Sequence, residues 1–156
     1  MTESTYVVFH LADERYALPI GSVERILANQ TPTRIPRTPP MFLGLFDLRG
    51  ETLAALDLRQ RLEMPIRDGE ANFIVIGTPQ GRVALRVDHV EGICRFEDDM
   101  IDEAPAFLQA KDDPFLQAVA RRQDALVVLL DPGHTVPSKL ETTLNKAGKK
   151  PALAAA

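Results

Sequence analysis

The sequence predicts a mostly β protein made of two similar small β-barrels that share one hydrophobic seam. Three observations predict this fold class: short apolar runs separated by turn residues, one segment that occurs twice, and a second pair of matching segments. Twelve prolines and nine glycines in 156 residues favour frequent chain reversals over a helical bundle. With 45% hydrophobic residues, the chain can bury a core without a disulfide or a structural metal.

The first repeat aligns positions 6–26 with positions 73–93 at a constant offset and without a gap. The identical pairs are Val8/Val75, Arg15/Arg82, Ala17/Ala84, Leu18/Leu85, Val23/Val90, Glu24/Glu91 and Ile26/Ile93. Most of the other pairs keep their apolar character. Each copy predicts a strand, a polar turn, a second strand and a short helical turn that ends in isoleucine. The chain therefore repeats half of a barrel.

A second pair of segments, at positions 44–58 and 118–132, also matches at a constant offset. Asp57 and Asp131 occupy equivalent positions near their ends. Each segment contains a nearly continuous apolar run that follows a polar reversal. Such runs predict strands buried on both faces, as between two packed barrels, although ordinary core strands explain most of these residues equally well.

The C-terminal segment predicts one short amphipathic helix. Ser138 and Glu141 have the spacing of a capping box, and Leu140 and Leu144 share one helical face. Residues 145–156 lack this pattern, so we expect a flexible tail.

Composition and charge exclude several classes of protein. The single cysteine, Cys94, permits neither an internal disulfide nor a CxxC site, which fits a reducing cytosol. The longest strongly apolar run, residues 125–130, is much shorter than the ~20 residues that span a bilayer. A net charge of -4 and a pI near 5.4 argue against general nucleic-acid binding. We therefore expect a cytoplasmic protein whose partners are other proteins.

A search for catalytic or metal-binding patterns gives no credible active site. Asp88, His89 and Glu91 suggest a metal site, but the first copy has glycine, serine and glutamate at the equivalent positions, which indicates an architectural role. The acidic stretch 96–105, followed by Asp112 and Asp113, lacks the glycine and spacing of an EF-hand and is interpreted as a solvated loop. Phosphate-binding glycine motifs and nucleophile elbows are missing. We predict a protein that is not an enzyme and needs no metal or other cofactor.

The segment Asp47 to Gly50, with the sequence DLRG, is the strongest candidate for a functional site. It lies in a predicted hairpin between residues 42–46 and 52–56, where Gly50 permits the reversal and Arg49 projects from it. One interpretation is a surface ion pair worth ~0–1 kcal/mol. The other is that the planar guanidinium binds a carboxylate on a helix of a partner protein.

From residue 5 to residue 144 the chain resembles the CheW-like family of bacterial chemotaxis coupling proteins. The ordered motifs are Val23–Ile26, Thr33–Pro36, Gly44–Gly50, Asp57–Arg59, Asp88–Val90 and Leu129–Asp131. The resemblance implies a single domain of two intertwined, SH3-like, five-stranded barrels. It also implies an adaptor that joins the cytoplasmic tips of chemoreceptors to the regulatory domain of a CheA-type histidine kinase at membrane-associated receptor arrays.

The resemblance also implies site residues. The receptor-facing positions of the family correspond to Val23, Leu48, Arg49 and Gly50, near the groove between the barrels. The kinase contact is implied mainly on the second barrel, without single residues.

This chain departs from the family pattern at several positions, among them Ala54 in place of a proline and the absence of the usual glycines near Ala84, His89 and the final hairpin. Two departures concern the candidate site. Arg25 replaces a glutamate thought to pair with the arginine of the turn, and Asp47 replaces an asparagine. Glu24 is the nearest acid, but on a helical turn it would point about 100° away from position 25. Either Asp47 pairs with Arg49, or the receptor-binding surface has been rebuilt. These departures suggest a divergent member, such as one serving a pilus or surface-sensing pathway.

Two other functions compete with the coupling hypothesis. The same barrels could form a small-ligand or nucleotide sensor that regulates a signalling partner, provided that the groove has enclosed volume and convergent polar groups. A hydrolase that uses Asp88, His89 and Glu91 is the weakest alternative, because the first copy lacks the histidine.

Overall fold

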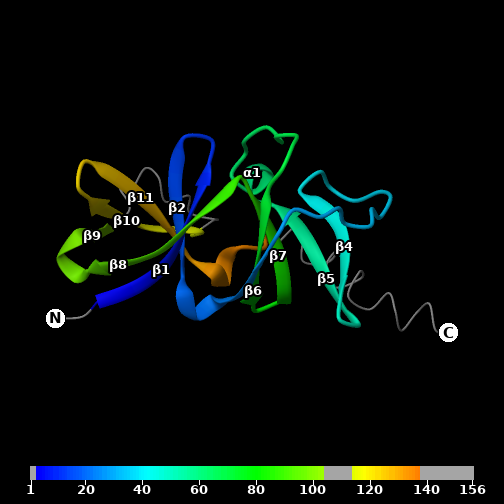
Figure 1. Ribbon diagram of the computed structural model, residues 1–156, viewed down its shortest axis with the longest axis horizontal. Coiled ribbons are helices and arrows are strands. Elements are labelled where there is room, and N and C mark those ends of the chain that lie inside the picture. Colours follow the sequence, from blue (N-terminus) through cyan, green and yellow to red (C-terminus); the bar gives the residue numbers. More distant parts are fainter. Residues whose placement is uncertain (1–2, 104–113, 138–156) are drawn as a thin grey trace.

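The computed structural model describes residues 3–103 and 114–137. The molecule is elongated, and its two antiparallel-rich sheets lie side by side along the long axis (Figure 1). The described chain is mostly β, as predicted.

The first sheet has six strands in the order β8-β1-β2-β11-β10-β9. Its strands are β1 (Glu3–Leu11), β2 (Glu14–Pro19), β8 (His89–Glu97), β9 (Ile101–Glu103), β10 (Leu116–Arg122) and β11 (Ala125–Leu130). The second sheet has five strands in the order β3-β6-β7-β5-β4. Its strands are β3 (Val23–Leu27), β4 (Phe42–Leu48), β5 (Glu51–Asp57), β6 (Asn72–Thr78) and β7 (Gly81–Val87). The short helical segments are η1 (Ile20–Ser22), α1 (Leu58–Arg61), η2 (Asp98–Met100) and η4 (Pro132–His134).

The two sheets exchange one strand. β3 follows β1 and β2 in the chain but pairs with β6 of the second sheet. β8 follows β6 and β7 in the chain but pairs with β1 of the first sheet. Each copy of the repeat thus contributes its third strand to the other sheet.

The predicted repeat is confirmed at the level of strand register. In the first hairpin Val8 lies opposite Ala17, and in the second Val75 lies opposite Ala84, which are the equivalent positions of the other copy. The exchanged strands β3 and β8 also pair at equivalent positions, and both pairings contain a bulge.

The second pair of segments is confirmed in the same way. The hairpins β4–β5 and β10–β11 pair antiparallel, and β5 and β11 then run parallel to β7 and β2. Asp57 caps α1 by accepting from the backbone N–H of Gln60 at 3.2 Å, and Asp131 caps η4 by accepting from Gly133 at 2.9 Å. The two aspartates therefore end equivalent strands in equivalent ways.

Two predicted details of the fold differ from the structure. The first sheet has six strands instead of five, and no pairing between described residues joins the end strands of either sheet, so closed barrels are not found. The predicted helical turn is also misplaced: residues 23–26 belong to β3, the helical residues are those of η1, and the second copy passes directly into β8. Four residues are too few to separate a helical period of 3.6 from a strand period of 2.

The strands of each sheet surround a hydrophobic cluster of their own. The cluster within the first sheet includes Val8, Ala17 and Phe96, and the cluster within the second includes Phe73, Val75 and Ala84. Alternate residues of β1 and β6 face the opposite side of their strand. Phe9 and Ile74 therefore belong to a third cluster, which combines side chains of both sheets. This third cluster is the predicted hydrophobic seam.

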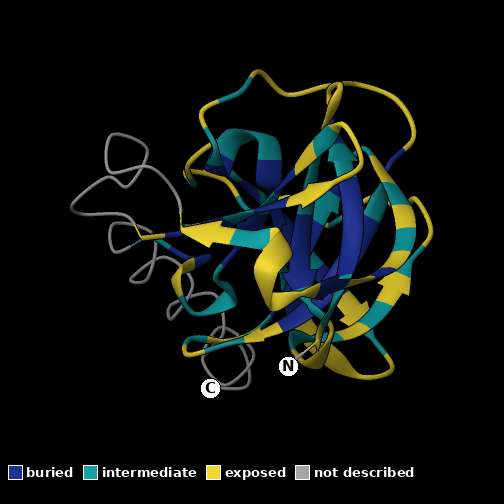
Figure 2. Cartoon of the chain, turned by 90° about the vertical axis from the view of Figure 1, so that its left-hand side faces the viewer, coloured by how far each residue is buried: buried dark blue, intermediate teal, exposed yellow. Residues whose placement is uncertain are grey.

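Burial follows this arrangement. Buried strands pass through the centre of the molecule and exposed loops surround them (Figure 2). Residues 53 and 55–57 of β5 are buried, as its apolar run predicts, whereas Leu126 of β11 is 60% exposed because it lies beyond the seam near the β10–β11 turn. Each leucine or phenylalanine buried in the seam contributes roughly 1.5–3 kcal/mol to folding.

Some predicted features lie outside the described residues, namely the helix at Ser138–Leu144, the tail 145–156, and Asp112 and Asp113. Within the acidic stretch 96–105, residues 96–103 form the end of β8, η2 and β9 instead of an irregular loop. Among the described residues no helix is long and apolar enough to cross a membrane.

Candidate protein-docking site

The DLRG segment forms a tight two-residue reversal between β4 and β5. Arg49 and Gly50 occupy its central positions with φ of 54° and 84°, and Leu48 lies opposite Glu51. Positive φ at both central residues is the pattern of a type I′ turn, whose twist matches that of the flanking strands. The carboxylate of Asp47 accepts a hydrogen bond from the backbone N–H of Gly50 at 3.0 Å. The predicted hairpin is therefore confirmed, and Asp47 braces its turn.

Arg49 is exposed at the tip of this turn, and in the described part of the chain it forms no ion pair or hydrogen bond. Of the two alternatives for Asp47, the structure does not show a pairing with Arg49, because the carboxylate of Asp47 accepts from backbone instead. Arg25 on β3 is half-buried and likewise makes no ion pair with a described residue. A positive φ is unusual for a residue with a long side chain, so the turn presents the guanidinium at some conformational cost.

Val23 and Leu48 lie on different strands and pack against different clusters. Val23 begins β3 and is half-buried against the seam. Leu48 ends β4 and is half-buried against the cluster within the second sheet. The structure therefore does not bring these two side chains into one hydrophobic cluster.

Arg82 of β7 connects the two segments that hold the candidate residues. Its Nε lies 2.7 Å from a carboxylate oxygen of Glu24, which follows Val23, and its Nη1 pairs with Glu51, which follows Gly50. Hydrogen bonds to Glu51 and then to Glu24 raise the pKa of Arg82. The start of β3 and the β4–β5 turn are thus anchored to one guanidinium. Sequence reasoning missed this role, although the identity of Arg15 and Arg82 within the repeat signalled it.

The first sheet has the equivalent ion pair, Arg15 with Glu91, but the residues around this pair differ from those around Arg82. Arg15 donates from Nε to Glu91 at 2.8 Å, and Nε2 of His10 lies 2.6 Å from the same carboxylate oxygen. The hydrogen bond from Arg15, followed by that from His10, lowers the pKa of Glu91. Ala125 stands where the second sheet has Glu51, so Arg15 has no second carboxylate partner among the described residues.

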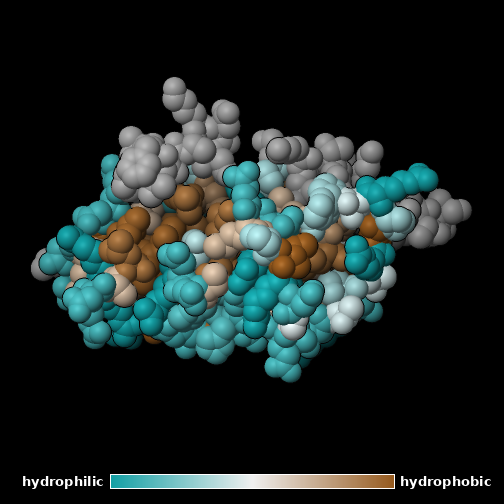
Figure 3. All heavy atoms as spheres, turned by 90° about the horizontal axis from the view of Figure 1, so that it is seen from above, coloured by the Kyte–Doolittle hydropathy of each residue, from teal (hydrophilic) through white to brown (hydrophobic). Residues whose placement is uncertain are grey.

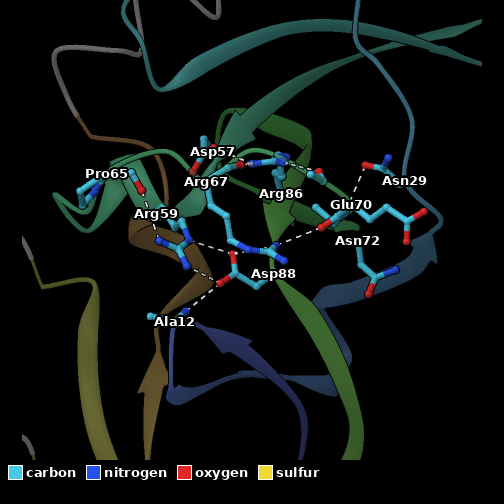
Figure 4. Close-up of polar contacts among 12 residues, drawn as sticks. Ala12, Asn29, Asp57, Arg59, Pro65, Arg67, Glu70, Asn72, Arg86 and Asp88 are labelled. Atoms are coloured by element: carbon cyan, nitrogen blue, oxygen red, sulfur yellow. Dashed lines mark hydrogen bonds and ion pairs between the residues drawn. The ribbon is translucent and has the colours of Figure 1, made fainter.

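A further cluster of charged side chains joins the two sheets near α1 (Figure 4). Arg59 donates to both carboxylate oxygens of Asp88, at 2.8 Å from Nε and 2.5 Å from Nη2, and the backbone N–H of Ala12 donates to Asp88 at 2.7 Å. Burial alone would raise the pKa of Asp88, but the bonds from Arg59 and Ala12 and the charges of Arg59 and Arg67 outweigh it, so the pKa is lowered. Two motif segments that are separate in the sequence therefore bind each other.

The acidic residues of the group formed by Asp88, His89 and Glu91 have arginine partners. Asp88 binds Arg59 and Glu91 binds Arg15, while the rings of His89 and His10 lie 5.9 Å apart. Within residues 3–103 and 114–137 no group of three or more histidine, cysteine or acidic side chains is arranged to hold a metal. The arrangement fits structural ion pairs between elements of the fold.

The surface carries apolar residues suited to contact with proteins. Seen from above, they gather in a band along the long axis, with hydrophilic residues along its lower side (Figure 3). Ile93 on β8 is 66% exposed. Extended apolar surface bordered by polar residues is typical of protein interfaces.

Comparison with known proteins agrees with this geometry. The family model of the CheW-like domain matches residues 5–139. Chemotaxis protein CheW of Bacillus subtilis is 29% identical over 133 residues, which cover 83% of this chain and 85% of that protein. Chemotaxis protein CheW of Helicobacter pylori is 26% identical over 127 residues, which cover 80% of this chain and 76% of that protein.

A solved structure shares the fold. The scaffolding protein TtCheW from Thermoanaerobacter tengcongensis superimposes with a TM-score of 0.78 and 25% identity, covering 86% of this chain and 92% of that one. The strand exchange, the repeat and these matches lead to one conclusion: this chain belongs to the CheW-like domain family.

Proposed function

We propose that this protein is a non-enzymatic scaffold of a chemosensory system, which couples chemoreceptors to a CheA-type histidine kinase. Membership of the CheW-like family carries the proposal. The relatives are chemotaxis proteins, and the solved relative is a scaffolding protein. Coupling requires surfaces that bind two partners, and it requires no reaction chemistry.

The receptor contact that we propose is the β4–β5 turn. Arg49 is exposed there without an ion-pair partner among the described residues, and Leu48 offers apolar surface beside it. A planar guanidinium on a braced turn suits a carboxylate on a receptor helix, because the backbone that carries the donor is held in place by Asp47. Val23 and Gly50 complete the proposed surface, and Glu24, Arg25 and Asp47 support it electrostatically.

Several further features belong to the same proposal. The domain extends over residues 5–144, with the two curled sheets in place of the SH3-like barrels of the family and a tail after residue 144. The kinase contacts mainly the second of these units. The protein acts in the cytoplasm and is recruited to membrane-associated receptor arrays, such as those of a pilus or surface-sensing pathway.

Titration calorimetry tests this function directly. The full chain is titrated with a receptor cytoplasmic tip and, separately, with a kinase regulatory domain. We expect micromolar binding to both partners, and we expect Arg49→Ala to weaken receptor binding more than kinase binding at a nearly unchanged Tm. Arg95→Ala is the matched control, because Arg95 is an exposed arginine on β8, away from the β4–β5 turn. Absence of binding to both partners at high micromolar concentration would exclude the coupling function.

A further inference from the structure

A pocket of about 380 Å³ lies beside the β10–β11 turn of the first sheet. Its lining consists of Arg15, Glu91, residues 122–125 and Val127. β10 and β11 lie toward the opposite end of the long axis from β4 and β5, which carry the proposed receptor contact (Figure 1). The kinase contact is proposed mainly on the second unit. The pocket is therefore a surface that the proposed coupling function does not require.

The β10–β11 turn is the internal equivalent of the β4–β5 turn. The second pair of matching segments aligns residues 122–125 with residues 48–51 at a constant offset. The first central residues of the two turns, Gln123 and Arg49, have φ of 56° and 54°. The residues that flank the two reversals also pair in the same way. A feature of one turn can therefore be compared directly with the same place in the other.

In the second sheet a carboxylate fills the place that the pocket has in the first. β11 runs parallel to β2 and β5 runs parallel to β7, in registers that the two repeat offsets relate. Ala125 on β11 is therefore placed relative to Arg15 on β2 as Glu51 on β5 is placed relative to Arg82 on β7. Arg82 uses Nε for Glu24 and Nη1 for Glu51. The molecule thus contains an occupied form of the same site, because one guanidinium has separate donors for two carboxylates.

In the first sheet the second carboxylate is missing. Nε of Arg15 donates to Glu91 at 2.8 Å, and no described residue provides a partner for the two Nη atoms of Arg15. The side chain of Arg15 is 41% exposed, and the methyl group of Ala125 offers no acceptor. Donors of Arg15 are therefore left without an acceptor, among the described residues, in the lining of the pocket.

The charges around the pocket permit one further carboxylate. Nη1 of Arg122 lies 4.0 Å from Glu91, and the side chain of Arg122 is 52% exposed. Asp124 contributes a carboxylate to the lining. The charges of Arg15 and Arg122 thus balance those of Glu91 and Asp124, a balance that the arginine–glutamate pair of the second sheet also has before its second carboxylate is counted. The unused donors, and not an excess of positive charge, determine what the pocket can bind.

We propose that this pocket binds one carboxylate group of a partner, in the place that Glu51 fills beside Arg82. The carboxylate accepts hydrogen bonds from the Nη atoms of Arg15 and from Arg122, in the space that the small side chain of Ala125 leaves open.

A carboxylate suits this pocket better than a phosphate. A phosphate carries up to two negative charges, and Glu91 and Asp124 would repel the second charge. An acidic side chain of a partner protein and a free carboxylic acid share the required chemistry, so the test compares these two sources.

An NMR titration of the ¹⁵N-labelled full chain with the blocked tripeptide Ac-Gly-Glu-Gly-amide tests the proposal. We expect a saturable shift of the side-chain Nε–H signal of Arg15 with millimolar affinity, as befits one partly exposed ion pair. Ac-Gly-Gln-Gly-amide is the matched control ligand and should give no saturable shift. Arg122→Gln should weaken binding about threefold. Arg121→Gln should not weaken binding, because Arg121 is exposed beside Asp102 and does not line the pocket.

Ala125→Glu is the most specific variant, because it supplies the carboxylate that the second sheet already has. We expect binding of the tripeptide to fall about tenfold relative to Ala125→Gln, which has the same size without the charge. Ala125→Glu should also have a higher Tm than Ala125→Gln. Added NaCl and Arg15→Gln should each reduce this difference. Circular dichroism verifies that each variant is folded.

The outcomes separate this inference from the coupling function. Tripeptide binding that survives Arg49→Ala supports the site, whatever the receptor and kinase titrations give. Weaker binding of acetate than of the tripeptide would support a protein side chain as the source, and equal binding would support a free acid. The proposal is overturned by absence of a saturable shift, by equal binding of the glutamine tripeptide, by equal loss in Ala125→Glu and Ala125→Gln, or by tighter binding of inorganic phosphate.

Discussion

Nε of Arg82 lies 2.7 Å from a carboxylate oxygen of Glu24, and the same two repeat positions meet again in Arg15 and Glu91, 2.8 Å apart. In both pairs the arginine and the glutamate come from different copies of the repeat. Arg82 and Arg15 lie two residues before Ala84 and Ala17 on the same strand faces, so each ion pair covers one end of the cluster within a sheet. Since partly exposed pairs stabilise weakly, we interpret them mainly as determinants of strand exchange and register.

Replacement of Arg82 should destabilise the protein partly through repulsion. In Arg82→Gln, Glu24 and Glu51 lose their shared counter-ion, so we expect a lower Tm, and the addition of Glu51→Gln should recover part of the loss. Thermal unfolding followed by circular dichroism measures both effects, and 1 M NaCl should shrink them. Strictly additive effects of the two substitutions would show that the carboxylates do not share the arginine.

The Arg15–Glu91 ion pair in the first sheet should show an energetic coupling that involves one carboxylate instead of two. A double-mutant cycle with Arg15→Gln and Glu91→Gln should give a coupling free energy of about 0.2–1 kcal/mol, as is usual for partly exposed pairs. Urea unfolding of the four proteins provides the measurement. Zero coupling would mean that His10 alone, 2.6 Å from Glu91, provides the interaction.

Acid should weaken the fold through Asp88. Because its pKa is lower in the folded protein than in the unfolded chain, the folded state favours the ionised form. The resulting stability is present above the ordinary carboxyl pKa of 3.8 and is lost as pH falls through the lower, folded value. Urea unfolding from pH 6 to pH 2.5 should show a shallower decline for Asp88→Asn than for the parent. Arg59→Gln should flatten the decline too, whereas parallel curves would argue against the Arg59–Asp88 interaction.

Much of this architecture could be predicted from the internal repeats. The constant offset of the first repeat correctly placed Val8 and Val75 at equivalent points of two hairpins. The constant offset of the second pair of segments correctly placed Asp57 and Asp131 at the ends of equivalent strands. These predictions succeeded because register is set by hydrophobic alternation and turn position, both of which are local. The resemblance to the CheW-like family was likewise confirmed.

The strand exchange could not be predicted in this way. β3 and β8 have similar patterns, so periodicity does not determine whether β3 pairs with β1 or with β6. For the same reason the sequence did not reveal the partner of Glu24. The sequence analysis considered Glu24 only as a partner of Arg49, whereas its partner is Arg82 in the other copy of the repeat. The side chains of β3 alternate between faces, so the helical argument about Glu24 was wrong, although Glu24 indeed does not pair with Arg49.

Gly44 should tolerate no side chain. Its φ is 141°, and a Cβ would overlap the carbonyl of Thr33, which accepts from the backbone N–H of Leu45 at 2.8 Å. We expect Gly44→Ala to lower the free energy of unfolding by about 2–3 kcal/mol through strain and loss of this bridge. Gly21→Ala is the control, because nothing lies within 4 Å of the position that its Cβ would occupy, and it should change stability by less than about 1 kcal/mol. Equal effects in urea unfolding would contradict the proposed overlap.

Arg49→Asn should separate stability from function at the β4–β5 turn. Asn-Gly is the preferred pair for a type I′ turn, and Asn tolerates the φ of 54° better than Arg does, so we expect a gain of about 0.5–1 kcal/mol in unfolding free energy. The same substitution removes the guanidinium, and receptor binding should therefore weaken while kinase binding persists. Differential scanning calorimetry and the receptor titration measure the two effects. A stabilised variant that still binds the receptor tip like the parent would show that Arg49 serves the turn and not the partner.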